Sequence, residues 1–300
     1  MATAETTTTP APRPDLRRRL ARGVVRLSVI VAAMGAIALT LGLIFSPDRA
    51  AIFPASFAGP LSPPPNGVEV INTEAGLVWF LPAEGDQPAP IIILFHGNGE
   101  NIAALLPNAK VYQSRGLAVA LVEYPGYGGT AGKPTQRTVT DAAVAAYDTM
   151  VERADVDQSR IIAHGFSLGG AVAAQLADSR DVHGLILEST FTSMPAMYRS
   201  MRIPGFLCRD PFRTDAVLAE YAGPVLLMHG KRDTIVPPSH SQDLLGIARD
   251  ATYLEMEGGH NDGPSDPVAY WQHIDALIEK AIGAPISPAA EQPRSGDGPR

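Results

Sequence analysis

The stretch Gly165-Phe166-Ser167-Leu168-Gly169-Gly170 decides the fold of this chain. An apolar run at residues 161–163 precedes it and an alanine-rich run at residues 171–177 follows it, which is typical of a buried strand, an abrupt turn and a helix. A serine at such a turn has a strained backbone, and its Oγ is exposed above the strand ends, facing the helix N-terminus. The same short pattern also occurs by chance, so the rest of the chain must support this interpretation.

Apolar runs recur on both sides of this motif, as expected of strands buried in a sheet. They occupy residues 90–95, 117–124, 184–187, 225–228 and 252–256, and residues 68–71 and 77–81 are typical of a further strand pair. Helical patterns lie at residues 101–113 and 138–153, and Asp266-Pro267 is typical of the start of a last helix. Strands that alternate with helices predict an α/β fold, with a mostly parallel sheet and helices on both faces.

Length and composition limit the classes of protein to which this chain can belong. A chain of 300 residues is long enough for one large α/β domain with a full core, which we place at residues 67–283. The net charge of −7 gives no reason to expect nucleic acid as a partner. The single cysteine, Cys208, allows neither an internal disulfide nor a cysteine-based metal site. Residues 284–300 are rich in Pro, Gly and polar residues, which predicts a disordered tail.

The N-terminal region has a different composition. Residues 1–26 predict a disordered tail that ends in a cluster of arginines, and residues 27–45 hold no charged residue. A helix of that length nearly spans a hydrocarbon core of ~30 Å. We interpret it as a single transmembrane anchor with a cytoplasmic N-terminus, which places the main domain on the other side of the membrane. A cleaved signal peptide and a buried core helix are the alternatives. Residues 46–66, rich in Pro and Ala, are interpreted as a linker or a loosely packed collar.

The alternation of strands and helices is interrupted at residues 192–221. This segment lies between two buried strands and carries several methionines and other apolar residues. Such residues often simply pack inside a fold. The alternative is a short cap over a site, and we predict that Met197 and Phe206 offer an apolar surface to a substrate there.

Two further polar residues follow strands late in the chain. Asp233 comes after the strand at residues 225–228, and His260 comes after the strand at residues 252–256. In an open α/β sheet such residues meet at the carboxyl edge. Serine hydrolysis needs a base beside the nucleophile and an acid that orients the base. The sequence therefore predicts Ser167 as nucleophile, His260 as base and Asp233 as acid, in the order expected of a nucleophile elbow. Glu188, at the end of an earlier strand, is the rival for the acid.

A small-residue turn follows the strand at residues 90–95. Its sequence is His96-Gly97-Asn98-Gly99, which lets backbone N–H groups turn toward a substrate. We assign the oxyanion hole to the N–H groups of Asn98 and Leu168, with the peptide of Gly99 as the alternative to Asn98. Gly97 and Gly99 are also predicted to contact substrate. His96 is interpreted as structural because it precedes the tight turn.

Taken together, these motifs resemble the α/β-hydrolase superfamily and, within it, the Bem46-like membrane-anchored serine hydrolases. The matching stretches are residues 95–101, 124–130 and 165–170, His229-Gly230-Lys231-Arg232-Asp233 with Val236-Pro237, and Gly259-His260-Asn261-Asp262. They cover about residues 68–282. The resemblance implies an eight-stranded sheet whose second strand is antiparallel, and hydrolysis of esters or thioesters. One departure is Gly99-Glu100, where relatives often have Ala-Gly, so a carboxylate lies near the oxyanion turn.

The expected function is that of a serine hydrolase that forms an acyl-enzyme and needs neither a metal nor an organic cofactor. Its expected partners are a small-molecule acyl ester or thioester, lipid-like or otherwise apolar, and the membrane at which that substrate is taken up. A serine peptidase with the same three residues is one alternative, although no propeller or large second domain is visible to select peptides. A non-catalytic binding scaffold is the other, and the presence of all three residues argues against it.

Overall fold

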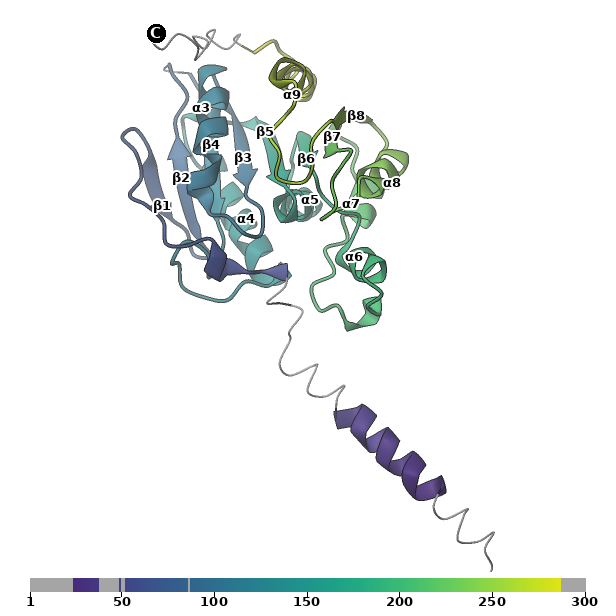
Figure 1. Ribbon diagram of the computed structural model, residues 1–300. Coiled ribbons are helices and arrows are strands. Elements are labelled where there is room, and N and C mark those ends of the chain that lie inside the picture. Colours follow the sequence, from purple (N-terminus) through teal and green to yellow (C-terminus); the bar gives the residue numbers. More distant parts are fainter. Residues whose placement is uncertain (1–23, 38–48, 50–51, 86, 287–300) are drawn as a thin grey trace, which may run out of the picture. The chain divides into compact units, whose positions relative to one another are not determined.

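A single sheet forms the centre of the fold. In the computed structural model, which describes residues 24–37, 49, 52–85 and 87–286, eight strands lie in the order β1-β2-β4-β3-β5-β6-β7-β8 (Figure 1). The strands are β1 (Glu69–Asn72), β2 (Leu77–Leu81), β3 (Ala89–Phe95), β4 (Ala118–Glu123), β5 (Val156–Phe166), β6 (Gly184–Glu188), β7 (Val225–Gly230) and β8 (Ala251–Met256). β2 pairs antiparallel with β1 and β4, and all other neighbours pair in parallel. The predicted sheet and its antiparallel second strand are confirmed.

The side chains of β3 show how the sheet is buried on both faces. Ile91, Ile93 and Phe95 belong to one apolar cluster, and Ile92 and Leu94 belong to a second cluster on the other face. None of the five exposes more than 2% of its surface. Because both faces are covered, the strand has the continuous apolar sequence from which it was predicted.

Helices cover both faces of the sheet (Figure 1). The first cluster contains side chains from α4 (Gln136–Val151), α5 (Leu168–Ser179), α7 (Thr214–Glu220) and α8 (Ser239–Ile247), and the second contains side chains from α3 (Leu106–Ser114) and α9 (Pro267–Ile282). α9 begins where predicted, with Asp266 as its N-cap. The helix expected at residues 101–113 is instead a 3₁₀ turn, η2 (Ile102–Leu105), followed by α3, because Asn101 caps the turn and Pro107 lies at the start of α3.

The predicted cap at residues 192–221 is shorter than expected. It contains α6 (Met194–Ser200) and a 3₁₀ turn, η3 (Gly205–Leu207), and it ends in α7. Leu218 of α7 is fully buried in the first apolar cluster, so α7 belongs to the helices that cover the sheet. The part that remains as a cap is α6, η3 and the loops beside them.

The N-terminal region differs in part from the sequence prediction. Residues 24–37 form a helix, whereas residues 38–45 of the expected membrane segment lie outside the described residues. In the part of the chain that is described, no helix is both long enough and apolar enough to cross a membrane. The compact unit that holds the sheet begins at Asp48, not at residue 67. The reason is packing: Ile52 and Phe53 are each only 5% exposed, and the Phe53 ring lies 6.1 Å from that of Phe212.

Candidate active site

Ser167 lies at the sharp turn between β5 and α5. Its backbone has φ 53° and ψ −115°, in a region that side chains other than glycine rarely adopt. Two hydrogen bonds hold this conformation: the Ser167 N–H donates to the Glu188 carbonyl (2.8 Å), and the Thr190 hydroxyl donates to the Ser167 carbonyl (2.7 Å). Neighbouring strand β6 and the loop after it therefore fix the turn.

Two glycines beside Ser167 are required by close backbone contacts. A Cβ atom on Gly165 would lie 2.0 Å from the Gly169 carbonyl oxygen, and a Cβ atom on Gly169 would lie 2.1 Å from the Phe95 carbonyl oxygen. Both distances are far below van der Waals contact. The glycine spacing in the motif therefore has a direct steric cause.

The structure brings the three predicted polar residues together. The Ser167 Oγ lies 3.0 Å from the His260 Nε2, and the His260 Nδ1 lies 2.6 Å from the Asp233 Oδ2. Because the ionised carboxylate only accepts hydrogen bonds, it fixes the proton on Nδ1 and leaves Nε2 to accept from the serine hydroxyl. This arrangement can activate the serine as a nucleophile.

Asp233 is held as an anion by several donors. Its Oδ1 accepts from the N–H groups of Ile235 (2.9 Å) and Val236 (2.8 Å), and its Oδ2 lies 3.2 Å from the His229 Nε2. Burial raises the pKa of this carboxyl, but the hydrogen bonds from His229, His260 and Val236 more than offset it, so the pKa lies well below its usual range. The carboxylate therefore stays charged beside the imidazole.

His229 is a functional neighbour that the sequence reasoning missed. It is fully buried at the end of β7, and its Nε2 lies 2.8 Å from the Val236 carbonyl while its Nδ1 lies 2.7 Å from the Ser241 hydroxyl. The Val236 carbonyl can only accept, so the proton lies on Nε2, which also points to Asp233. The only signal in the sequence was its place at the start of the stretch that contains Asp233.

The loop that carries His260 packs closely on the end of β7. A Cβ atom on Gly230 would lie 2.5 Å from the Gly258 carbonyl oxygen, so this position needs glycine. Within the loop, the Gly259 N–H donates to the Asp262 carboxylate at 2.7 Å. These contacts position His260 between Asp233 and Ser167.

The predicted oxyanion-hole groups lie beside Ser167. Leu168 is the first residue of α5, where backbone N–H groups have no partner within the helix. Asn98 follows β3, and its carbonyl accepts from the Tyr127 hydroxyl at 3.1 Å, which holds the turn. Gly97, Asn98, Gly99 and Leu168 all line the cavity that contains Ser167. The choice between the N–H groups of Asn98 and Gly99 stays a prediction.

Glu100 and His96 both form hydrogen bonds with Gly97, in the turn that follows β3. The Gly97 N–H donates to the Glu100 carboxylate at 3.3 Å, so this carboxylate contacts the turn. His96 is fully buried, with its Nε2 2.9 Å from the Glu123 carboxylate and its Nδ1 2.7 Å from the Gly97 carbonyl. Neither of these hydrogen bonds goes to Ser167, as expected of a structural residue.

The cavity around Ser167 has a volume of about 510 Å³ and is mostly apolar. Met197 lines it, as predicted, together with Met194, Phe191, Met201 and Ile235. Phe206 does not line it and exposes 82% of its surface, so its predicted place in a substrate groove is wrong. The physical reason is that Phe206 lies on η3, beyond the residues of this segment that line the cavity, which are Met194, Met197 and Tyr198 of α6 and Met201 directly after it.

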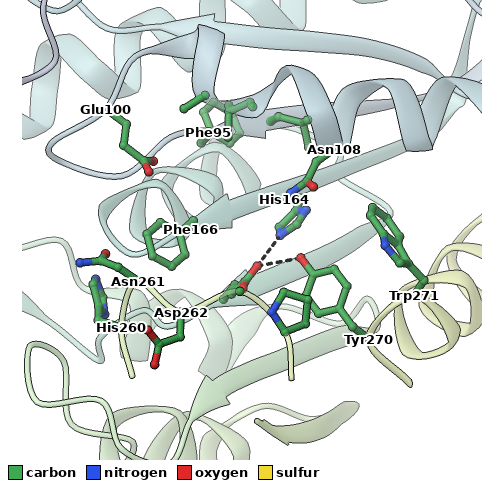
Figure 2. Close-up of a pocket in the computed structure, with 16 residues that line it drawn as sticks. Phe95, Glu100, Asn108, His164, Phe166, His260, Asn261, Asp262, Tyr270 and Trp271 are labelled. Atoms are coloured by element: carbon green, nitrogen blue, oxygen red, sulfur yellow. Dashed lines mark hydrogen bonds and ion pairs between the residues drawn. The ribbon is translucent and has the colours of Figure 1, made fainter. Parts of the chain in front are cut away.

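A second cavity of about 360 Å³ adjoins the first (Figure 2). The rival acid, Glu188, lines it, where its Oε2 accepts from the Tyr270 hydroxyl at 2.9 Å and lies 3.5 Å from the His164 Nε2. Burial, and then the charge of Glu188, raise the pKa of Tyr270, which keeps its proton as the donor. Glu188 thus pairs with His164 and Tyr270, whereas Asp233 pairs with His260. Among the described residues no group of three or more His, Cys, Asp or Glu could hold a metal ion.

The fold and this site define an α/β hydrolase. Residues 86–209 match the family described as serine aminopeptidase, S33. The α/β hydrolase domain-containing protein WAV2 of Arabidopsis thaliana is 34% identical over 227 residues, which are 67% of this chain and 74% of WAV2. Protein bem46 of Schizosaccharomyces pombe is 31% identical over 221 residues, 69% of this chain and 74% of bem46. The chain belongs to the Bem46-like family of α/β hydrolases, as its motifs indicated.

Solved structures agree on the fold. Est1E from Butyrivibrio proteoclasticus superimposes with a TM-score of 0.58, and the match covers 71% of this chain and 97% of Est1E. The two sequences are only 17% identical, so this likeness concerns the arrangement of the sheet and helices and not the substrate.

Proposed function

We propose that this protein is a serine hydrolase that cleaves carboxylic ester or thioester bonds of apolar acyl substrates near a membrane. One observation carries the proposal: the hydrogen-bonded chain Ser167–His260–Asp233 opens into an apolar cavity. In this mechanism Ser167 attacks the acyl carbon while His260 takes its proton. His260 then donates that proton to the leaving group, and water releases the acyl group in a second, similar step.

Two electrostatic contributions support the mechanism. Asp233 stays ionised and stabilises the imidazolium that forms when His260 takes the proton. In this proposal the N–H groups of Leu168 and Asn98 donate to the oxyanion, and each such donor is worth about 2.7–4 kcal/mol in the transition state. None of these steps requires a metal or an organic cofactor.

The lining of the first cavity supports an apolar acyl group. Met194, Met197 and Met201 line it with Phe191 and Ile235. Methionine side chains fill irregular shapes, so they suit acyl chains of more than one form. Each buried methylene of the substrate adds about 0.8 kcal/mol of binding free energy. We therefore expect kcat/KM to rise with acyl length until the cavity is full.

Exposed residues beside this cavity support uptake from a membrane. Phe206, Met201 and Ile203 expose 82%, 58% and 39% of their surfaces, and the exposed Arg199 and Arg202 lie in the same segment. Apolar side chains among arginines suit contact with an anionic bilayer. The uncharged stretch at residues 27–45 is, in this proposal, the anchor that keeps the domain at the bilayer.

The test has two parts. Wild-type protein should react covalently with a fluorophosphonate probe, and Ser167→Ala should abolish the labelling and lower kcat by on the order of 10⁴-fold or more. In a series of acyl esters and thioesters, Met197→Asp should remove the preference for longer chains, while Phe206→Asp, outside the cavity, should leave it in soluble assays. A steady fall of kcat/KM beyond short chains, unchanged by Met197→Asp, would refute the apolar acyl site.

A peptidase is the second candidate, because the matching family is described as a serine aminopeptidase. The same three residues cleave amides in other proteins. Aminoacyl anilides assayed beside acyl esters separate the two functions. Turnover of the anilides at a higher kcat/KM than any ester would favour the peptidase.

A further inference from the structure

The second cavity lies where the leaving group of an ester must go. It shares Glu100, Phe166, His260 and Asn261 with the cavity around Ser167, so the two cavities adjoin. Figure 2 shows Phe166 between Glu100 and the loop of His260, with Asn108, Tyr270 and Trp271 toward the other end. The Phe166 ring lies 5.1 Å from the His260 ring, so this pair stands at the junction.

The reaction assigns different parts of the substrate to the two cavities. The acyl group is bound next to Ser167, in the apolar cavity. The proton that His260 takes from Ser167 must pass to the leaving oxygen, so the alcohol part of an ester lies on the side of His260. His260 lines both cavities, and the second is the one that extends away from Ser167.

The two cavities differ in chemistry. The second contains the buried His164 and Tyr270 and the partly buried Glu188, and it adds the side-chain amides of Asn108 and Asn261. Among the described residues neither amide has a hydrogen-bond partner. The Oε1 of Glu188 has none either, since the Tyr270 hydroxyl and the His164 Nε2 both contact its Oε2. The amides donate and accept, and the carboxylate accepts. A ligand with several hydroxyl groups satisfies both kinds of group.

We propose that the second cavity binds the alcohol part of the substrate, and that this alcohol is a neutral polyol. The inference rests on the proposed esterase function and specifies its leaving group. The volume of about 360 Å³ falls within the usual range of ligand sites, roughly 300–1,000 Å³. The carboxylates of Glu100, Glu188 and Asp262 disfavour an alcohol that carries a phosphate.

The experiment compares two esters that share one acyl chain, the 1-glyceryl ester and the n-propyl ester, which differ only in two hydroxyl groups. Wild-type protein should hydrolyse the glyceryl ester with a kcat/KM at least tenfold higher. Asn108→Leu, which keeps the size of the side chain, should bring this ratio close to one. Asn261→Ala, in an exposed loop, should lower this ratio as well. It replaces Asn108→Leu as the test variant if Asn108→Leu fails to fold. Lys110→Ala, on α3 but outside the cavity, is the matched control and should keep the wild-type ratio.

Other outcomes overturn the proposal. Equal rates on both esters, or a ratio that neither asparagine variant changes, would show that the cavity does not select the alcohol, while ester hydrolysis itself would stand. A higher kcat/KM for the matching choline ester would replace the neutral polyol by a cationic alcohol. Failure to hydrolyse any ester, with no fluorophosphonate labelling, would instead refute the proposed function and this inference with it.

Discussion

At the residue scale, a few glycines make the site possible. Gly169 lets α5 start directly against the end of β3. A Cβ atom at this position would lie 2.1 Å from the Phe95 carbonyl oxygen, which is part of the backbone and cannot shift without distorting the strand. Gly246, in α8, is the opposite case, with nothing within 4 Å of an added Cβ. An added methyl group should therefore clash with backbone at Gly169 and meet open space at Gly246.

Gly169→Ala should destabilise the fold by about 3 kcal/mol or more, as expected of overpacking against rigid backbone. Gly246→Ala should be neutral or stabilise the fold by up to about 1 kcal/mol, because alanine favours helix. Urea unfolding of both variants measures these changes. Equal stability of the two variants would contradict the steric account of the motif.

A second residue-scale prediction concerns Asp233 and pH. Its pKa is lowered in the folded state, so its ionisation stabilises the fold above the ordinary pKa of about 3.9. That contribution is lost as the pH falls from about 4 toward the lower pKa of the folded state. Asp233→Asn lacks it at every pH. The difference in unfolding free energy between wild type and Asp233→Asn should therefore be smaller at pH 3 than at pH 6, and a constant difference would contradict the assignment.

Some site residues were predictable and others were not. Ser167, Asp233 and His260 each follow an apolar run within a glycine-rich stretch, so local pattern was enough to select them. The support of Asp233 by His229 and of Glu188 by Tyr270 depends on contacts between distant segments. Phe206 was misplaced for the same reason, since composition shows that a side chain is apolar but not which way its turn faces.

At the element scale, strands were predicted better than helices. Strands buried on both faces appear as continuous apolar runs, and their positions in the structure match within a few residues, except that β5 begins at Val156, before its apolar run. The short helices α6, α7 and α8 were not predicted individually. Their seven to nine residues are too few to show a clear helical period, and packing on the sheet determines them.

The long helix α9 was predictable from its cap. The Asp266 carboxylate accepts from the N–H groups of Val268 and Ala269, both at 3.0 Å. Asp266→Ala should cost about 1 kcal/mol of stability, whereas Asp266→Asn keeps the acceptor and should cost much less. Thermal unfolding of the two variants tests this. A similar loss in both would mean that charge at the helix start, not the hydrogen bond, is what matters.

At the scale of the whole molecule, the chain before the first strand is part of the catalytic unit. Arg49 pairs with the buried Asp210 at 2.7 Å, and the Asp210 carboxylate also accepts from the Gln136 N–H. Ile52 lines the cavity around Ser167. The composition of residues 46–66 predicted a linker or a loosely packed collar, and among the described residues of this range Ile52 and Phe53 pack into the core.

Two truncated chains separate the proposed anchor from the packed segment. A chain that lacks residues 1–47 should leave the membrane fraction, stay folded, and hydrolyse soluble esters at a rate close to that of the full chain, because the compact unit begins at Asp48. A chain that lacks residues 1–66 also loses Ile52 and Phe53. Removing the Phe53 side chain alone leaves a cavity and should cost about 3–5 kcal/mol, so the shorter chain should be much less stable.

The full chain with the single change Phe53→Ala is the control that assigns this loss to packing and not to the anchor. It should remain with membranes and unfold at a lower urea concentration. If the chain without residues 1–47 still sediments with membranes after a high-salt wash, residues 27–45 are not the anchor. If the chain without residues 1–66 is as stable as the longer one, residues 46–66 are a linker after all. Fractionation, urea unfolding and ester hydrolysis on the same preparations distinguish these results. Removal of residues 1–47 should change only the membrane association, and the further removal of residues 48–66 should change the stability as well.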